Sequence, residues 1–184
     1  MPKTIEYYQQ ELALQRELDN KDEQASTLRS IGAVWSALGE QRKALDFYEQ
    51  ALLLSRAVGN RSVEATTLNN IGTVWHALGE QYKALDFYEQ ALPLLRAVGD
   101  RGGEAVTCFN IGLIYRDLGD LDKAIEYVSR CVELDEQIEH PDLESDRRML
   151  EQLMQQRSGV SSPREGPTTI QEKKRFWQRL FGSK

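Results

Sequence analysis

The strongest constraint on the fold is a block of sequence that occurs twice, almost unchanged, with a period of forty residues. Residues 71–100 read IGTVWHALGEQYKALDFYEQALPLLRAVGD and residues 31–60 read IGAVWSALGEQRKALDFYEQALLLSRAVGN, so only six of thirty positions differ. A looser copy, IGLIYRDLGDLDKAIEYVSRCVELDEQ, begins at Ile111. A fixed period of this length is typical of stacked helical hairpins.

Each block predicts two helices. In the second block the first helix carries an apolar stripe at positions i, i+3, i+4, i+7 and i+10, formed by Leu68, Ile71, Gly72, Trp75 and Leu78. We expect Gly79 to end this helix in the left-handed conformation, and Glu80 to open the next one. Asn60 and Asp100 are suitable N-caps for the helices that follow them. Because neither helix can bury its stripe alone, the hairpins must stack on their neighbours.

This pattern resembles the tetratricopeptide repeat. Small residues at Gly72, Ala84 and Ala91 alternate with bulky residues at Leu68, Ile71, Trp75 and Tyr88, and the preceding block matches at the same slots. The third block departs from the pattern at Val128 and Cys131. The forty-residue period is similar to that of kinesin light chains and of bacterial, cyanobacterial-like arrays. The resemblance implies an all-α, right-handed solenoid that binds partners in a concave groove.

The chain divides into seven predicted segments. Residues 1–24 align with the second helix of a repeat and are expected to form an N-terminal half-repeat helix, either as a native cap or as the edge of a longer array. Three full repeats are expected at 25–64, 65–104 and 105–141, followed by a C-terminal capping helix at 142–157. Residues 158–169 are rich in Gly, Ser, Pro and Thr and predict a flexible linker. Residues 170–184 predict a short amphipathic helix.

Composition limits the function classes. There is no apolar run of eighteen residues and no apolar signal core at the N-terminus, so we expect a cytoplasmic protein. Residues 170–184 carry a net charge of +4, which leaves −10 on the remaining chain and argues against a nucleic-acid partner. Cys108 and Cys131 lack the spacing of metal ligands and are interpreted as buried thiols. The sequence shows no catalytic motif, so no enzyme activity, cofactor or metal is predicted.

The resemblance to tetratricopeptide repeats implies a set of groove residues, because the first helix of each hairpin lines the groove in that family. The corresponding positions in this sequence are Arg29, Ser30, Ala33, Ser36, Asn69, Asn70, Thr73, His76, Phe109, Asn110, Leu113 and Arg116. Asn70 and Asn110 are the favoured anchors, since an amide both donates and accepts hydrogen bonds and can hold a ligand's backbone.

The C-terminal segment IQEKKRFWQRLFGSK is the second functional signal. On a helix its aromatic and aliphatic residues share one face with basic residues around it, a pattern that suits an anionic membrane surface. It resembles the membrane-targeting helix of MinD, the bacterial division-site ATPase. The alternatives are docking on a protein partner and an inert solubilising end. The residues expected to act in membrane or partner binding are Lys173, Lys174, Arg175, Phe176, Trp177, Arg179, Leu180 and Phe181.

The sequence therefore favours a non-enzymatic adaptor that binds a protein or peptide in its groove and is tethered to the inner face of a membrane by its tail. One alternative is a soluble self-assembling module, possible as a homo-oligomer, whose tail docks on a protein. Another is a regulatory subunit of a separate enzyme.

Overall fold

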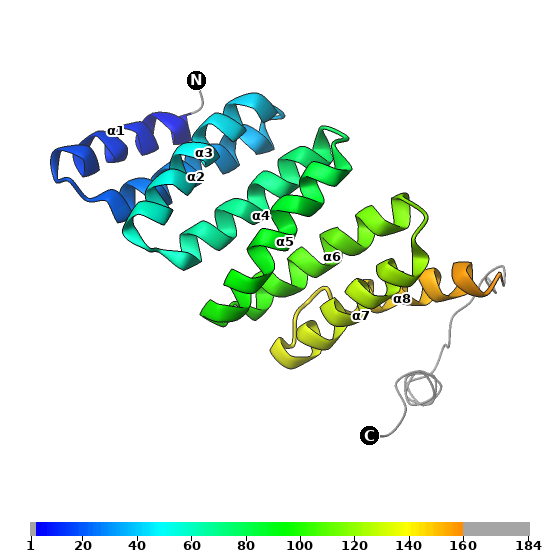
Figure 1. The fold of residues 1–184 in the computed structure, drawn as a ribbon. Helices are drawn as coiled ribbons and strands as arrows, with labels where there is room; N and C mark the ends of the chain where they lie inside the picture. The colour runs from blue at the N-terminus through cyan, green and yellow to red at the C-terminus, as the bar shows by residue number, and fades with distance from the viewer. Residues whose placement is uncertain (1–2, 160–184) are drawn as a thin grey trace.

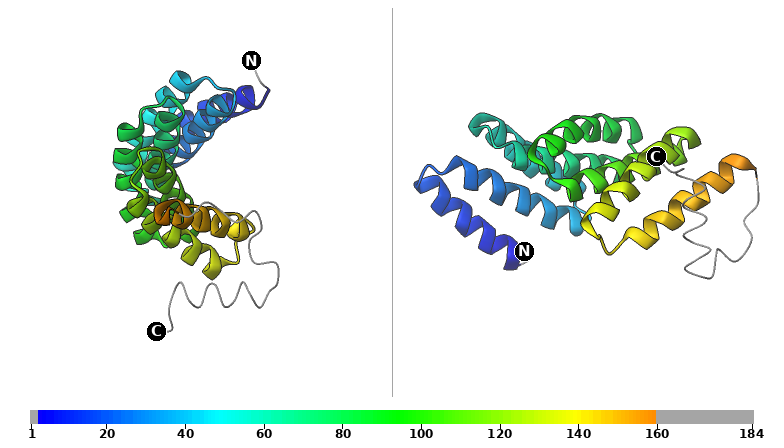
Figure 2. Two further views of the ribbon diagram at one scale, coloured as in Figure 1. Left: turned by 90° about the vertical axis from the view of Figure 1, so that its right-hand side faces the viewer. Right: turned by 90° about the horizontal axis from the view of Figure 1, so that it is seen from below.

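The computed structural model describes residues 3–159, and this part of the chain is entirely helical. The helices are α1 (Lys3–Glu17), α2 (Lys21–Ala37), α3 (Gln41–Val58), α4 (Arg61–Ala77), α5 (Gln81–Val98), α6 (Arg101–Asp117), α7 (Leu121–Ile138) and α8 (Leu143–Ser158). They stack in chain order along a curved path (Figures 1 and 2). The predicted all-α solenoid is confirmed for the described residues.

The helices form two layers. Each of the pairs α2–α3, α4–α5 and α6–α7 packs as a hairpin, and α1 and α8 pack against the two ends of the stack. Helices α2, α4 and α6 also contact one another from repeat to repeat, whereas α3, α5 and α7 are held apart. The layer with closer helices lies on the inside of the curve, so α2, α4 and α6 line the concave face (Figure 2).

Polar caps set the start of each inner helix. The side chains of Asn20, Asn60 and Asp100 accept hydrogen bonds from the backbone N–H groups of Glu23, Val63 and Gly103. The inner helices consequently begin at residues 21, 61 and 101, directly after these caps. The predicted N-caps at Asn60 and Asp100 are confirmed.

Glycines end both helices of the first two hairpins and the inner helix of the third, whereas the C-cap of α7 is Glu139. Gly39, Gly79 and Gly119 follow the inner helices with φ values of 77°, 79° and 81°, as expected for Gly79 from the sequence. Gly59 and Gly99, each with φ of 73°, end α3 and α5. Only a residue without a Cβ adopts this left-handed conformation without strain, so these glycines fix the repeat length.

The packing of the core repeats with the forty-residue period of the sequence. Gly32 and Gly72 lie directly under the rings of Tyr48 and Tyr88, and a Cβ added at Gly72 would come within 2.7 Å of Tyr88 Cε1. Tyr88 is 0% exposed, and Ile71 and Leu95 are each 1% exposed. Pro93 lies on the exposed side of α5, which continues past it to Val98. Close approach at the glycines therefore allows the two helices of each hairpin to pack against each other.

Helix α8 closes the C-terminal end of the stack. Leu150 and Leu153 are buried against α7, as expected, with Leu143 and Met154 packed around them. The side chain of Arg147 is 23% exposed and forms ion pairs with Glu136 and Glu144. It is drawn inward because both carboxylates lie beside it, one on α7 and one on α8.

Candidate partner-binding groove

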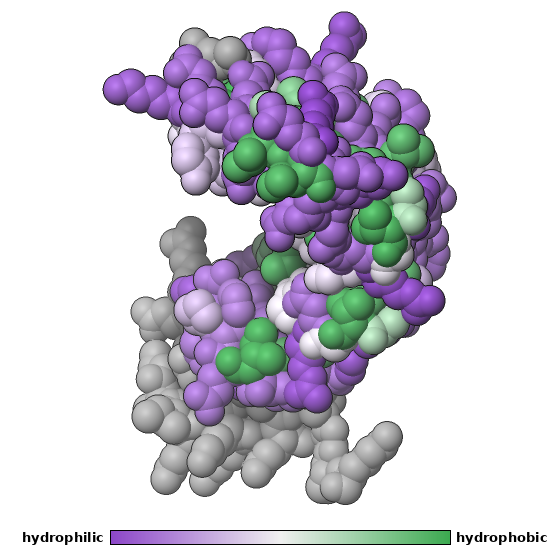
Figure 3. All heavy atoms as spheres, turned by 90° about the vertical axis from the view of Figure 1, so that its left-hand side faces the viewer, coloured by the Kyte–Doolittle hydropathy of each residue, from purple (hydrophilic) through white to green (hydrophobic). Residues whose placement is uncertain are grey.

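The concave face forms a hollow between the two ends of the array, and polar side chains dominate its rim (Figure 3). The twelve residues predicted for this groove all lie on α2, α4 and α6. Ala33 and Thr73 are exposed, and the other ten are half-buried. The fold thus brings the predicted set onto one face, although several members have internal partners that lower their availability to a ligand.

The side chain of Asn69 forms a hydrogen bond within the protein. Its side-chain oxygen accepts a hydrogen bond from the hydroxyl of Thr107, 2.8 Å away on the next inner helix. Thr107 is 0% exposed and also donates to the carbonyl of Gly103 at 2.7 Å. Asn69 therefore joins α4 to α6, a role that its position on the sequence pattern did not reveal.

Three other predicted groove residues make contacts within or next to their own hairpin. The hydroxyl of Thr73 lies 3.1 Å from the Tyr88 hydroxyl, and Ser36 donates to Gln41 Oε1 at 3.4 Å. Ser30 donates to the carbonyl of Ser26 at 3.0 Å. These hydroxyl groups therefore already have partners within the protein.

Asn70 and Asn110 differ from Asn69. They occupy the same position in two successive repeats, both are half-buried, and neither amide forms a hydrogen bond to another residue in the described part of the chain. Each amide thus has a donor and an acceptor available to a ligand. Their spacing by one repeat lets an extended chain contact both.

Two arginines flank the amides. Arg116, on α6, forms an ion pair with Asp117 at 2.7 Å and contacts the sulfur of Met149 on α8 at 3.8 Å. Arg29, on α2, buries its Nε without a hydrogen-bond partner among the described residues. Burial raises the pKa of the nearby Tyr48 to about 12, and the positive charge of Arg29 acts in the opposite direction. Arg29 is consequently a groove cation with a buried nitrogen that no described residue satisfies.

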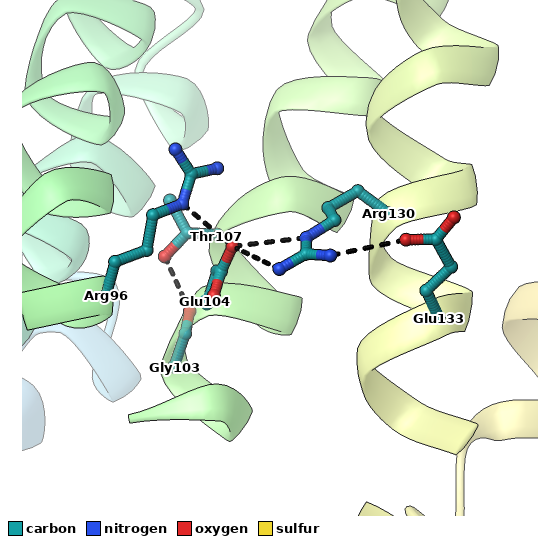
Figure 4. Close-up of polar contacts among 6 residues, drawn as sticks. All are labelled: Arg96, Gly103, Glu104, Thr107, Arg130 and Glu133. Atoms are coloured by element: carbon teal, nitrogen blue, oxygen red, sulfur yellow. Dashed lines mark hydrogen bonds and ion pairs between the residues drawn. The ribbon is translucent and has the colours of Figure 1, made fainter. Parts of the chain in front are cut away.

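A buried carboxylate that the sequence analysis missed lies at the junction of α5, α6 and α7 (Figure 4). Glu104 is 4% exposed, and its Oε1 accepts hydrogen bonds from Arg96 Nε at 2.8 Å and from Arg130 Nε and Nη2 at 3.2 Å. Burial alone would raise its pKa, but the hydrogen bonds and charges of the two arginines outweigh burial and lower it. This cluster ties three helices together and does not line the groove.

The predicted membrane or partner residues from Lys173 to Phe181 lie outside the described residues. Among the helices of residues 3–159, none combines the length and the hydropathy that a membrane crossing requires.

Comparison with known proteins identifies the repeat. The sequence matches the model of the tetratricopeptide repeat over residues 1–57 and 63–137. No curated protein matches it.

Several solved structures share the fold. The apo form of RapI is 17% identical with a TM-score of 0.74, covering 84% of this chain and 44% of RapI. BtubC from P. vanneervenii is 18% identical with a TM-score of 0.67, covering 89% and 77%. Aspartyl phosphate phosphatase F from Bacillus subtilis is 18% identical with a TM-score of 0.74, covering 82% and 39%.

These likenesses concern the fold, and the chain spans less than half the length of RapI and of phosphatase F. The period, the small-residue slots and the family match agree over most of the chain. The chain belongs to the tetratricopeptide repeat family, whose helical arrays are typically scaffolds for protein interactions.

Proposed function

We propose that this chain is a non-enzymatic adaptor that holds an extended peptide of a partner protein in its concave groove. The observation that carries this proposal is the pair Asn70 and Asn110, which present amides at equivalent positions of α4 and α6. A ligand backbone lying along the groove would exchange hydrogen bonds with both amides. Such contacts hold the ligand's main chain, and Arg29 supplies a charge for an acidic side chain or a terminal carboxylate.

The test begins with the full chain as bait for a library of displayed peptides. The affinity of a selected peptide is then measured for Asn70→Ala, for Asn110→Ala and for Gln90→Ala, an exposed control on α5 in the outer layer. Each groove substitution is expected to weaken binding about five- to tenfold, the value of one ordinary hydrogen bond. Equal affinities for wild type and both groove variants would refute the proposed site.

The second part of the proposal is that residues 170–184 attach the adaptor reversibly to the cytoplasmic face of an anionic membrane. The support is the sequence of this segment, with its five basic residues and its aromatic pair Phe176 and Trp177. Each basic residue near an anionic surface contributes about 1 kcal/mol, and this contribution is weakened by salt. The whole chain should therefore sediment with anionic vesicles at low salt, whereas a chain ending at Thr169 should not. Failure of the whole chain to sediment would direct attention to a protein partner for the tail.

Self-association is the second candidate function. Helix α1 and the turn after it expose three large apolar residues, with Tyr7 at 65%, Leu14 at 56% and Leu18 at 69%. A second copy could cover them. Sedimentation equilibrium over a hundredfold range of concentration distinguishes a self-associating module from a monomeric adaptor. The mass of the first rises with concentration, whereas the mass of the second stays constant.

A further inference from the structure

A thiol and two carboxyl groups converge between α7 and α8. The sulfur of Cys131 lies 3.4 Å from Asp135 Oδ2 and 3.7 Å from Asp146 Oδ2. Cys131 and Asp135 lie one turn apart on α7, and Asp146 reaches them from the first turns of α8. One donor atom of each residue lies within 4.8 Å of the other two.

All three side chains are withdrawn from water. Cys131 and Asp135 are each 2% exposed and Asp146 is 7% exposed. Within the described residues, the only side-chain partners of the two carboxyl groups are each other and the thiol. Among residues 3–159, no lysine, arginine or histidine forms an ion pair with them, although burying carboxylates without a counter-charge is costly.

The preceding repeats show how this fold neutralises a buried or half-buried acid. Arg56 pairs with Glu64, and Arg96 pairs with Glu104, each across the turn into the next inner helix. The forty-residue period places Glu136 at the position of these arginines in α7. At this last junction Arg147 of α8 pairs with Glu136 and with Glu144, the counterpart of Glu64 and Glu104. Among residues 3–159, no comparable ion pair includes Asp135 or Asp146.

The two α7 residues also depart from the repeat. Cys131 occupies the slot of Ala51 and Ala91, and Asp135 occupies the slot of Ser55 and Leu95. Two positions that hold small or apolar side chains in the earlier repeats therefore both hold side chains that can bind a metal. A third such side chain, Asp146 of α8, lies directly opposite them. Packing alone does not call for this exchange.

We propose that Cys131, Asp135 and Asp146 bind one divalent transition-metal ion of the zinc class. Zinc–sulfur and zinc–oxygen bonds of about 2.3 and 2.1 Å in a tetrahedron separate sulfur from oxygen by about 3.6 Å. The two sulfur–oxygen distances of 3.4 and 3.7 Å lie on either side of this value. A thiolate with two carboxylates suits zinc better than calcium or magnesium, which prefer oxygen ligands alone.

The metal would join α8 to the end of the repeat stack. Its binding releases the Cys131 thiol proton and any proton that the carboxyl pair shares, so that the cation takes the place of protons in the interior. The fourth coordination position is left for water. The ion would thereby stabilise the C-terminal end of the array, which in this family must be closed against solvent.

The experiment uses the full chain after removal of metals with a chelator, titrated with Co²⁺ and then with Zn²⁺. Thiolate–Co²⁺ charge-transfer absorption is expected to appear with a stoichiometry of one ion per chain and to vanish when Zn²⁺ displaces it. Cys131→Ala is expected to abolish the absorption, and Asp146→Asn to lower the Zn²⁺ affinity at least about 100-fold. Cys108→Ala is the matched control, because Cys108 is an equally buried thiol outside the cluster.

Unfolding experiments separate ligand loss from misfolding. Zn²⁺ is expected to raise the thermal midpoint of wild type and of Cys108→Ala but not that of Asp146→Asn, while circular dichroism shows that all three remain helical. The absence of a thiolate band, or Co²⁺ binding that Cys131→Ala leaves unchanged, would overturn the proposal. These readouts do not involve the groove, so they can fail while the proposed adaptor function stands.

Discussion

Arg96 Nε lies 2.8 Å from Glu104 Oε1 across the turn between α5 and α6, and the same oxygen accepts two hydrogen bonds from Arg130 of α7. One carboxylate thus holds three consecutive helices together. Because each repeat of a solenoid contacts only its neighbours, a bond that spans a junction contributes directly to the cooperativity of the stack.

Replacing Glu104 with Gln should make stability less dependent on pH. The pKa of Glu104 is lowered in the folded chain, so its contribution is present above its unfolded pKa and is lost as pH falls through the folded pKa. At pH 7 the variant is expected to be less stable by about 1–3 kcal/mol, and the gap should narrow below about pH 4. Urea unfolding at a series of pH values measures this gap.

The control for that series is Glu133→Gln, since Glu133 pairs with Arg130 but its side chain is 55% exposed. Its effect should stay below about 1 kcal/mol at every pH. A gap between Glu104→Gln and wild type that did not change with pH would contradict the account of this junction.

Substituting Gly72 with Ala should destabilise the array by about 1–3 kcal/mol, because the added methyl group would lie 2.7 Å from the Tyr88 ring. Gly102→Ala in α6 provides the matched control, since its nearest neighbours lie at 3.8 and 4.0 Å. That change should be neutral or stabilising by up to about 1 kcal/mol. Thermal unfolding compares the two variants. Equal changes in stability would show that the close Gly72–Tyr88 contact does not exclude a side chain at position 72.

Substitutions at Asn69 and Asn70 should affect different properties, the first the stability of the chain and the second its affinity for a peptide. Asn69→Ala removes one of the two acceptors of the buried Thr107 hydroxyl and the hydrogen bond that joins α4 to α6, and is expected to cost about 1 kcal/mol of unfolding free energy. Asn70→Ala should leave stability within about 0.5 kcal/mol of wild type and weaken the selected peptide instead. Denaturation and peptide titration on both variants provide the check. The reverse pattern would mean that the two amides have been assigned the wrong roles.

The helix cap at Asn60 should contribute more than the N-cap position at Glu80. Asn60 accepts from Val63 N at 2.9 Å, whereas Glu80 makes no side-chain cap bond. Asn60→Ala is therefore expected to cost about 1 kcal/mol and Glu80→Ala at most about half of that. Chemical denaturation resolves the difference, and equal costs would argue against capping as the reason that α4 begins at Arg61.

The repeat made most of the fold predictable. A forty-residue period fixes the hairpin, and Gly79 and Gly119 mark helix ends that a side chain would strain. The starts of α4 and α6 were also predictable, because Asn60 and Asp100 were recognised as N-caps and both side chains accept cap hydrogen bonds in the structure.

The contacts between repeats were not predictable in the same way. Asn69 and Asn70 are adjacent in sequence, and only the geometry of α4 against α6 decides that one meets Thr107 and the other does not. Cys131 was correctly expected to be buried, but Asp146 lies beyond the turn at Pro141, so no sequence spacing indicates that the two meet. Such contacts arise between elements and leave no periodic signal.

The most direct test of the proposed adaptor function is nuclear magnetic resonance of the isotope-labelled full chain titrated with a selected peptide. The side-chain amide resonances of Asn70 and Asn110 are predicted to shift with saturation, while those of Gln50 and Gln90 on the outer layer stay in place. Shifts confined to the outer layer, with both asparagine amides unmoved, would contradict binding in the concave groove.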